Sequence, residues 1–456
     1  MTGAGAFWTL DLVAAALARE STGARPSGAR PLRAIATDTR TLADGDCFVA
    51  LAGEKYDAHD FLAPAVAAGA SALVVSRPER AAGLGVPVFA VRDTLRALGA
   101  LAHFRRRVWG GPVIAVGGSN GKTTTKELLA AALDARLETH ATSGNLNNLV
   151  GVPLTLLALP AHSDIAVVEM GMNVPGEMAR LRAIAAPEVA LVTSIGEEHL
   201  EGLGSLAVVL HEESTIFEDT ELAITPASQP EIAAAAKGRA RRVVQAGLDE
   251  GDVRATRWHV GADGLGAIEI DGVTVRPPAR GVHNLRNAML ALAAARECGV
   301  SMEDAARGIA RATLPKMRLS WEALGRATLI NDAYNASPAS MRAAIDLVGG
   351  AGDGRQRVAV LGGMRELGAH SARLHDQVAR YALASRAEVI AGIGDLGAAL
   401  RAAGPGDARV ITAADVDDLW PLLEPRLAPD AVILLKASRG VQLERLVPHL
   451  TAWAER

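Results

Sequence analysis

Cysteine is nearly absent from this chain: the 456 residues include only two, Cys47 and Cys298. Two cysteines are too few for a disulfide framework or for a metal site built on cysteine. Both lie in apolar stretches, where a small buried thiol is common. We therefore assign no chemistry to either cysteine.

The sequence also lacks a long apolar run and a large excess of charge. No run approaches the roughly 20 residues that a membrane-spanning helix needs. The first 19 residues lack the basic start of a leader and carry Asp11 in their apolar part. A formal net charge of -4 argues against nucleic acid as the main partner, and the short basic clusters 105–107 and 237–242 are expected to be solvated helix ends. We expect a cytoplasmic monomer.

The composition and length of the chain limit its possible fold class and number of domains. Hydrophobic residues make up 49% of the sequence and charged residues 21%, which is typical of a globular protein. At about 150 residues per domain, 456 residues suggest three domains. Strand-like and helix-like segments alternate along most of the chain, which predicts parallel α/β sheets. The first alternation ends near residue 95, where we expect a domain boundary.

The most informative stretch is PVIAVGGSNGKTTTKE, residues 112–127, in which a short apolar strand stops at glycine before a helix begins. Glycines in such a loop let backbone N–H groups turn toward phosphate oxygens, and the following helix directs its positive end at them. Lys122 adds a full charge, and the hydroxyl of Thr123 suits a magnesium ion held by the same phosphates. The residues expected to bind ATP are Gly118, Ser119, Asn120, Gly121, Lys122, Thr123 and Thr124.

The spacing of this loop departs slightly from the usual phosphate-binding pattern. Residues 118–123 read G-x-x-G-K-T rather than G-x-x-x-x-G-K-[ST]. A glycine-rich turn with an exposed lysine is the alternative interpretation.

Two further strands are expected at 165–168 and 189–193, and both end in polar groups. Glu169 follows the first, and the loop after the second carries His199. Because the carboxyl ends of neighbouring parallel strands meet at one edge of a sheet, we expect both side chains near Lys122. A carboxylate there suits magnesium. A salt bridge for Glu169 and a capping role for His199 are the alternatives.

Two other polar clusters stand out. The first follows a predicted strand and combines a carboxylate, a hydroxyl and a guanidinium, which suits a polar or phosphorylated ligand, although a capped turn is equally consistent. It consists of Asp38, Thr39 and Arg40. The second is a group of amides denser than a helix start needs, although it could simply cap. It consists of Asn145, Asn147 and Asn148.

The remainder of the chain adds an amide pair and a further sheet. Asn284 and Asn287 lie three apart on one face of a predicted helix, where paired amides could read adenine, although capping explains Asn284 equally well. Strand signals recur in the last third and predict another parallel sheet. The expected strands are 327–330, 358–361, 388–393 and 431–436.

Together these motifs resemble the Mur ligase family of peptidoglycan synthesis, over nearly the whole chain. The resemblance is carried by GSNGKTTTKE, TSGNLNNLVGVP, the H-N-x-x-N of residues 283–287 and the DTR of residues 38–40. DAYNASP, LGGMRELG and KASRG are similar to C-terminal signatures of the branch that adds D-alanyl-D-alanine to UDP-N-acetylmuramoyl-tripeptide.

The resemblance implies an α/β protein of three domains. A small N-terminal α/β domain (1–95) would bind the UDP-sugar, and a central parallel-sheet ATPase domain with the phosphate loop (96–316) would bind ATP. A C-terminal Rossmann-like domain (317–456) would bring the dipeptide and close over the nucleotide. The implied activity is amide ligation through an acyl phosphate, with ATP and Mg²⁺, forming ADP and phosphate.

The resemblance also assigns residues to roles. The catalytic positions are Lys122, Glu169, His199 and Arg318, the last of which would reach the γ-phosphate from the C-terminal domain. Further ATP positions are Asn284, Asn287 and Asp332. The substrate positions are Asp38, Thr39, Arg40, Asn145, Asn147, Asn148, Tyr334 and Asn335. The metal positions are Thr123, Glu169, His199 and the doubtful Glu213.

Glu213 is doubtful because the family's pattern has a lysine at that point, carbamylated to hold a second metal. A glutamate is shorter, so we expect it to reach a metal only through water or after a helix shift; a solvated helix residue is the alternative. Gly363, Ser337 and Ala437 are smaller departures, replacing aspartate, asparagine and glycine. Two other functions stay open: a folylpolyglutamate synthase-like ligase, and a relative that binds without ligating.

Overall fold

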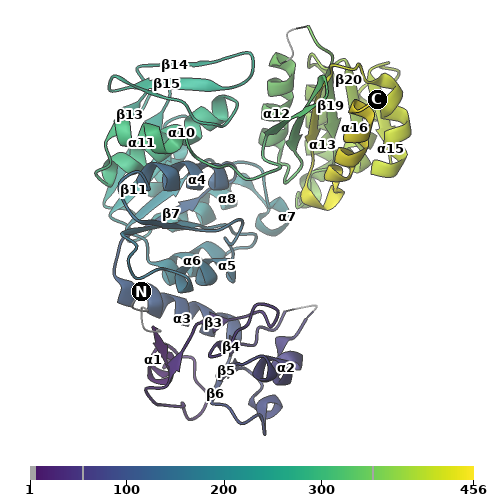
Figure 1. Cartoon of the computed structure of the whole chain (residues 1–456). Coiled ribbons are helices and arrows are strands. Elements are labelled where there is room, and N and C mark those ends of the chain that lie inside the picture. Colours follow the sequence, from purple (N-terminus) through teal and green to yellow (C-terminus); the bar gives the residue numbers. More distant parts are fainter. Residues whose placement is uncertain (1–6, 54–55, 352–353) are drawn as a thin grey trace.

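The computed structural model describes residues 7–53, 56–351 and 354–456, which form three α/β domains (Figure 1). The N-terminal domain lies at the bottom of Figure 1, the central domain above it and the C-terminal domain at the upper right. Each domain is built on a sheet of its own, as the fold prediction required. The exact boundaries at 95 and 316 stay predictions.

The N-terminal domain is organised on a four-stranded parallel sheet. Its strands are β3 (Ile35–Ala36), β4 (Cys47–Val49), β5 (Ala72–Val75) and β6 (Val88–Ala90). Every residue of β5 is buried because alternate side chains face opposite sides: Ala72 and Val74 join one apolar cluster, Leu73 and Val75 another. The outlying elements are β1 (Trp8–Thr9), β2 (Pro31–Leu32), α1 (Leu10–Ala16) and α2 (Leu62–Ala67).

Helix α3 (Thr94–Trp109) joins the first two domains. Asp93 starts it, since its carboxylate accepts hydrogen bonds from the backbone N–H groups of the first turn. Leu98 and Leu101 of this helix belong to the N-terminal core, whereas the next residue, Ala102, belongs to the cluster beneath the central sheet. One continuous helix therefore packs into both cores.

The prediction that residues 105–107 form a solvated helix end was wrong for two of the three arginines. Arg105 and Arg106 are buried, and only Arg107 is exposed. The Arg106 guanidinium donates to the carbonyl oxygen of Ala185 at 2.8 Å and forms an ion pair with Glu188 at 2.6 Å. The sequence pattern could not show these partners, because they lie about 80 residues further along.

The central domain contains a seven-stranded parallel sheet in the order β13-β12-β11-β10-β7-β9-β8. The strands are β7 (Val113–Gly117), β8 (Thr139–Ala141), β9 (Ile165–Glu169), β10 (Val189–Val192), β11 (Leu222–Pro226), β12 (Arg242–Gly247) and β13 (Val253–Arg254). The helices are α4 (Lys122–Leu133), α5 (Gly151–Leu157), α6 (Glu177–Ala185), α7 (Leu200–Leu203), α8 (Leu206–Ser214), α9 (Pro230–Ala236), α10 (Val282–Glu297) and α11 (Met302–Ile309). Since β7 lies between β9 and β10, the loops that follow these three strands meet at one edge.

A small antiparallel sheet, absent from our sequence expectations, follows the last central strand. It consists of β14 (Arg257–Val260), β15 (Gly266–Ile270) and β16 (Val273–Val275). Its buried residues, such as Ile268 and Val275, join the core beneath α10.

The C-terminal domain has a six-stranded sheet in the order β17-β18-β22-β19-β20-β21. Its strands are β17 (Ser320–Leu324), β18 (Ala327–Asp332), β19 (Arg357–Leu361), β20 (Val389–Ile393), β21 (Val410–Ala413) and β22 (Val432–Lys436). Its helices are α12 (Pro338–Gly350), α13 (Ser371–Leu383), α14 (Gly394–Ala403), α15 (Val416–Leu423) and α16 (Leu446–Ala454). The four predicted strands are confirmed; β17, which pairs antiparallel, and β21 were not predicted.

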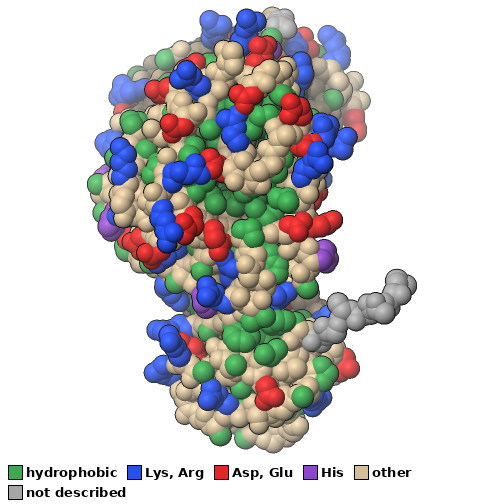
Figure 2. Space-filling view, turned by 90° about the vertical axis from the view of Figure 1, so that its left-hand side faces the viewer, with side chains coloured by type: hydrophobic (Ala, Val, Ile, Leu, Met, Phe, Trp, Pro, Cys, Tyr) green, Lys and Arg blue, Asp and Glu red, His purple; other side chains and the backbone are tan. Residues whose placement is uncertain are grey.

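The surface carries charges of both signs side by side. On the face shown in Figure 2, Lys and Arg side chains lie among Asp and Glu side chains over the upper part of the molecule. In the described part of the chain, no helix has the length and apolar character needed to cross a membrane.

Candidate active site

A cleft of about 860 Å³ lies between the central and C-terminal domains. From the central domain it is lined by the phosphate loop and by the loops after β8, β9 and β10; the predicted residues there are Ser119 to Thr124, Asn145, Asn147, Asn148, Glu169, His199, Asn284 and Asn287. From the C-terminal domain it is lined by Arg318, Asp332, Tyr334, Asn335 and Lys436, among others. Most of the predicted site residues therefore meet in one place, although they are separated by up to 216 positions along the sequence, from Ser119 to Asn335.

The phosphate loop connects β7 to α4 in a conformation that requires glycine at two positions. Gly118 and Gly121 have φ angles of 113° and 88°, which side-chain-bearing residues rarely adopt. A Cβ atom at Gly118 would lie 2.4 Å from Thr193 Oγ1, and one at Gly121 would lie 2.6 Å from Asn287 Oδ1. The loop is therefore closely packed between the loop after β10 and helix α10.

Lys122, the first residue of α4, turns back over its own loop. Its Nζ donates to the carbonyl oxygens of Gly118 and Ser119, the latter at 3.1 Å, and lies 3.5 Å from Glu198 Oε1. Burial opposes the charge of the ammonium group, but the carboxylates of Glu198, Glu213 and Glu169 outweigh that effect and raise the pKa of Lys122. Lys122 is thus a fixed cation at the centre of the cleft.

Glu169 lies beside Lys122 at the end of β9, fully buried. Its Oε1 accepts from Asn147 Nδ2 at 2.8 Å and from Thr123 Oγ1 at 3.1 Å. Its Oε2 has no hydrogen-bond partner within the described residues. Oε1 of buried Glu198 also lacks a hydrogen bond there, but the Lys122 ammonium lies 3.5 Å from it. Buried carboxylate oxygens without a partner are costly unless a cation or water occupies the space beside them.

The free oxygen of Glu169 fits a magnesium ion. Mg²⁺ prefers oxygen ligands, keeps several waters and is commonly bound by one or two carboxylates together with substrate phosphates. In the residues that the structure describes, no three His, Cys, Asp or Glu side chains gather tightly enough to hold a metal ion by themselves. A site that relies on phosphate oxygens and water for its remaining ligands is consistent with that arrangement.

His199 lies at the mouth of the cleft, directly before α7. Its Nδ1 contacts Glu366 of the C-terminal domain, and its Nε2 is 4.0 Å from Glu198 Oε2. Burial lowers the pKa of His199, but the hydrogen bond with Glu366 and the charge of Glu198 outweigh it, so the pKa is raised overall.

Glu213 is not a solvated helix residue, so that alternative was wrong. Its side chain is buried, and Oε2 accepts a 2.7 Å hydrogen bond from the backbone N–H of Gly118. Burial raises the pKa of this carboxyl group to about 7. Glu213 therefore lies against the phosphate loop, with one oxygen committed to the loop backbone. Its neighbour Glu212 faces elsewhere and accepts from Gly176 N.

The C-terminal wall of the cleft carries two cations. The Arg318 guanidinium lies 4.3 Å from the centre of the Tyr334 ring, a cation–π geometry. Lys436 Nζ pairs with Asp332 Oδ2 at 2.7 Å and donates to Asn335 O at 2.6 Å. Burial raises the pKa of Asp332 despite the opposing effect of Lys436. Positive charge thus faces the cleft from both domains.

Five predicted residues do not line this cleft. Gly118 and Glu213 lie behind the phosphate loop, bonded to each other. Asp38 and Arg40 lie in the N-terminal domain, the first half-buried and the second exposed, and pair with each other at 2.5 Å with Thr39 between them. The Arg40 hydrogen bonds lower the pKa of Asp38 to about 2.

The amide pair also differs from expectation: Asn284 does not cap α10 but donates to Arg280 O, and Asn287 packs on Gly121.

The cleft also contains residues that the sequence interpretation did not select. Lys436 ends β22 within the motif KASRG, and its position at the carboxyl end of a predicted strand was an available signal. Glu198 was part of an acidic run, but the pattern did not show which acid faces Lys122. Beside the cleft, Ser337 Oγ of the C-terminal domain donates to Asn120 Oδ1 of the phosphate loop at 2.8 Å, a contact without any sequence signal.

Comparison with known proteins supports the resemblance. Residues 116–295 match the Mur ligase middle domain, and residues 317–439 match the domain described as Mur ligase, glutamate ligase domain. The chain is 37% identical over 432 residues to the UDP-N-acetylmuramoyl-tripeptide–D-alanyl-D-alanine ligase of Escherichia coli (strain K12). The aligned region covers 92% of this chain and 94% of the relative. The chain belongs to the Mur ligase family.

Solved structures place this Mur ligase with the MurF type. A crystal structure of MurF from Acinetobacter baumannii has a TM-score of 0.89 and 32% identity, covering 98% of this chain and 99% of that one. MurF from Thermotoga maritima in complex with ADP has a TM-score of 0.82 and 25% identity, covering 92% and 98%. The three-domain architecture of this Mur ligase is therefore that of MurF.

Proposed function

We propose that this Mur ligase uses ATP to join D-alanyl-D-alanine to UDP-N-acetylmuramoyl-tripeptide, in the cytoplasm and as a monomer. The observation that carries the proposal is the cleft itself, which has a phosphate loop with Lys122 on one wall and Arg318 and Lys436 on the other. An anionic carboxylate can approach a triphosphate only where their charges are neutralised. Cations from two domains supply that neutralisation.

In the proposed reaction, a carboxylate oxygen of the tripeptide attacks the γ-phosphorus of ATP, the bond to the β-phosphate oxygen breaks and ADP leaves. The amine of the dipeptide then attacks the resulting acyl phosphate, the carbonyl carbon–oxygen bond breaks and phosphate leaves as the nitrogen loses a proton. Lys122 binds phosphate oxygens throughout, and Arg318 approaches the γ-phosphate from the C-terminal domain.

Thr123, Glu169 and His199 would hold magnesium, with Glu198 and Glu213 beside them. Magnesium bound there would neutralise the charge of the triphosphate. Glu169 is fixed for this role by Asn147 and Thr123, which leave its second oxygen free. Asn284 and Asn287 support the nucleotide from α10, and Asp332 supports it from β18. In the N-terminal domain, Asp38, Thr39 and Arg40 bind the UDP-sugar.

Phosphate release measured with ATP, UDP-N-acetylmuramoyl-tripeptide and D-alanyl-D-alanine tests the proposal. Release should require all three substrates, and the product should gain the mass of the dipeptide. Release with a folate and glutamate instead would favour a folylpolyglutamate synthase-like ligase. Nucleotide binding without phosphate release would favour a relative that binds without ligating.

A further inference from the structure

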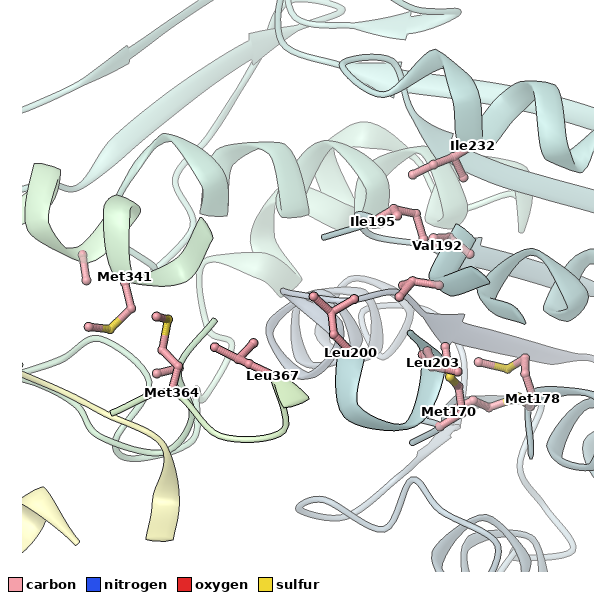
Figure 3. Packing of buried hydrophobic residues seen from close by; sticks show 14 of the residues in the cluster. Met170, Met178, Val192, Ile195, Leu200, Leu203, Ile232, Met341, Met364 and Leu367 are labelled. Atoms are coloured by element: carbon pink, nitrogen blue, oxygen red, sulfur yellow. The ribbon is translucent and has the colours of Figure 1, made fainter. Parts of the chain in front are cut away.

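The loop that carries His199 is covered by a loop from the C-terminal domain. The first is the segment 196–204, which includes α7. The second is the segment 362–373, which follows β19 and includes the first three residues of α13. Figure 1 shows α7 at the side of the central domain that faces the C-terminal domain. Leu200 and Leu203 of α7 and Leu367 of the second loop are buried in the same apolar cluster, and Figure 3 shows Leu200 and Leu367 close together.

Polar contacts fix the alignment of the two loops. The backbone N–H of Glu201 donates to the carbonyl oxygen of Glu366 at 2.9 Å. His370 Nε2 donates to the carbonyl oxygen of Gly204 at 3.0 Å, and Arg373 pairs with Glu197 at 3.2 Å. The two loops therefore dock in one defined register.

The central contact in this interface joins Glu366 to His199. Glu366 Oε2 accepts from His199 Nδ1. Both residues have left-handed backbones, with φ angles of 62° and 52°, which are uncommon outside glycine and cost of order 1 kcal/mol or more. Strained backbone of this kind persists only where surrounding contacts hold it in place, so the interface fixes the conformations of both residues.

This contact sets the orientation of the imidazole. When Nδ1 carries the proton that Glu366 accepts, the neutral ring presents the lone pair of Nε2, and Nε2 lies on the side of Glu198. A histidine that binds a metal usually donates its other ring nitrogen to a carboxylate, which fixes its tautomer and angle. Here that carboxylate belongs to a different domain.

We propose that Glu366 is a positioning residue that orients His199 toward the cleft, so that the metal-binding half of the site is complete only when the C-terminal domain is docked on α7. The proposal rests on the proposed ligase function for its catalytic consequence. Its structural consequence, metal affinity, can be measured without turnover.

Three variants distinguish a positioning role of Glu366 from a role in holding the two domains together. They are Glu366→Ala, Glu366→Gln and Arg373→Ala. Arg373→Ala is the matched control, because it removes an ion pair of the same interface without touching His199. The binding of Mn²⁺, in place of Mg²⁺, to each variant with a non-hydrolysable ATP analogue is followed by electron paramagnetic resonance. We expect Glu366→Ala to weaken Mn²⁺ binding about 10-fold or more, Glu366→Gln to weaken it less because its amide oxygen still accepts, and Arg373→Ala to match the parent.

Turnover gives the second readout. Glu366→Ala should lower kcat by about 10- to 100-fold with a smaller change in KM for ATP. In a double-mutant cycle, adding Glu366→Ala to His199→Ala should cause no further loss of Mn²⁺ affinity, because the two act through one contact.

Three results would overturn the proposal: parent-like Mn²⁺ affinity in Glu366→Ala, equal losses in Glu366→Ala and Arg373→Ala, or additive losses in the double variant. An inactive parent that still shows the expected Mn²⁺ pattern would contradict the ligase function and leave the positioning role supported. If Glu366→Ala does not fold, Glu366→Gln decides: its Mn²⁺ affinity should lie below those of the parent and Arg373→Ala, and an affinity equal to theirs would overturn the proposal.

Discussion

Lys122 is held by two carbonyl oxygens of its own loop and by the field of three carboxylates, those of Glu169, Glu198 and Glu213. A cation that is already fixed in the cleft need not be ordered when a triphosphate binds, so the charge acts at little entropic cost. At the scale of single residues, the site is therefore a prearranged balance of charges rather than one reactive side chain.

Replacing Lys122 by alanine should abolish most turnover while the protein stays folded. The change removes a charge from the phosphate oxygens, and we expect kcat/KM to fall by about 10²- to 10³-fold. Circular dichroism and phosphate release measure the two quantities, with the exposed Lys237→Ala as a parent-like control. Turnover at the parent rate in Lys122→Ala would show that the phosphate-loop assignment is wrong.

Glu213 supports the phosphate loop from beneath, and two substitutions should distinguish its shape from its charge. Glu213→Ala leaves the N–H of Gly118 without its acceptor, which should lower the free energy of unfolding by about 1 to 3 kcal/mol. Glu213→Gln keeps an acceptor oxygen and should cost less. Chemical denaturation compares them; equal stability of alanine, glutamine and parent proteins would refute the supporting role.

The same carboxyl group should make stability depend on pH. Because burial raises its pKa from 4.5 to about 7, the folded protein binds the proton more tightly than the unfolded chain does. The contribution of Glu213 to stability is then largest below pH 4.5 and is lost as the pH rises to about 7. In Glu213→Gln, the melting temperature should decline less between pH 5 and 8 than in the parent. Identical slopes would count against this assignment.

At the scale of elements, strand ends and helix starts bring the chemistry together. β7, β9 and β10 are adjacent, so the phosphate loop, Glu169 and the loop of His199 extend from neighbouring strands. Helix α12 approaches from the other side and begins with a capping box, in which the side chains of Ser337 and Ser340 each accept from the backbone N–H of the other residue. Ser337 also donates to Asn120, so this cap is a contact between domains.

Ser337→Ala should therefore do more than weaken a helix. Loss of the cap should cost about 1 kcal/mol, and loss of the bond to Asn120 should raise KM for ATP because the phosphate loop is less well held. Ser301→Ala removes the cap of α11, which has no partner across the cleft, and is the matched control. The two variants should melt at similar temperatures but differ in KM; an equal KM in both would exclude a functional contact.

At the scale of the whole molecule, the site is formed from two domains. Lys122 belongs to the central domain, whereas Arg318 and Lys436 belong to the C-terminal domain, and apolar packing around α7 and α12 unites the two (Figure 3). Such an arrangement allows the substrates to enter with the domains apart and excludes water when they come together.

Arg318→Ala should accordingly lower kcat more than it weakens ATP binding. The guanidinium stands on the C-terminal wall and is stacked on Tyr334, so it meets the γ-phosphate only when the two walls are close. Steady-state kinetics, with the nucleotide dissociation constant measured separately, provide the test. A large rise in KM for ATP with unchanged kcat would mean that Arg318 acts in binding alone.

The sequence by itself determined the fold class, the phosphate loop and the family. Gly118 to Thr123 could be interpreted locally because the conformation of a glycine-rich turn and the start of a helix depend on neighbouring residues. The strands 113–117, 165–169 and 189–192 were predictable for the same reason, since continuous apolar runs mark strands buried on both faces.

Only the tertiary structure decided which polar groups meet. Arg106 bonds to Glu188, Glu213 to Gly118 and Glu366 to His199, across sequence separations of 82, 95 and 167 residues. Local patterns contain no record of such partners. Arg105 and Arg106 were therefore expected in solvent, and Glu213 was left between a metal position and a solvated helix residue; all three are buried. Burial and pairing depend on how domains pack, and that is why the chemistry of these side chains follows from the fold and not from their neighbours in the chain.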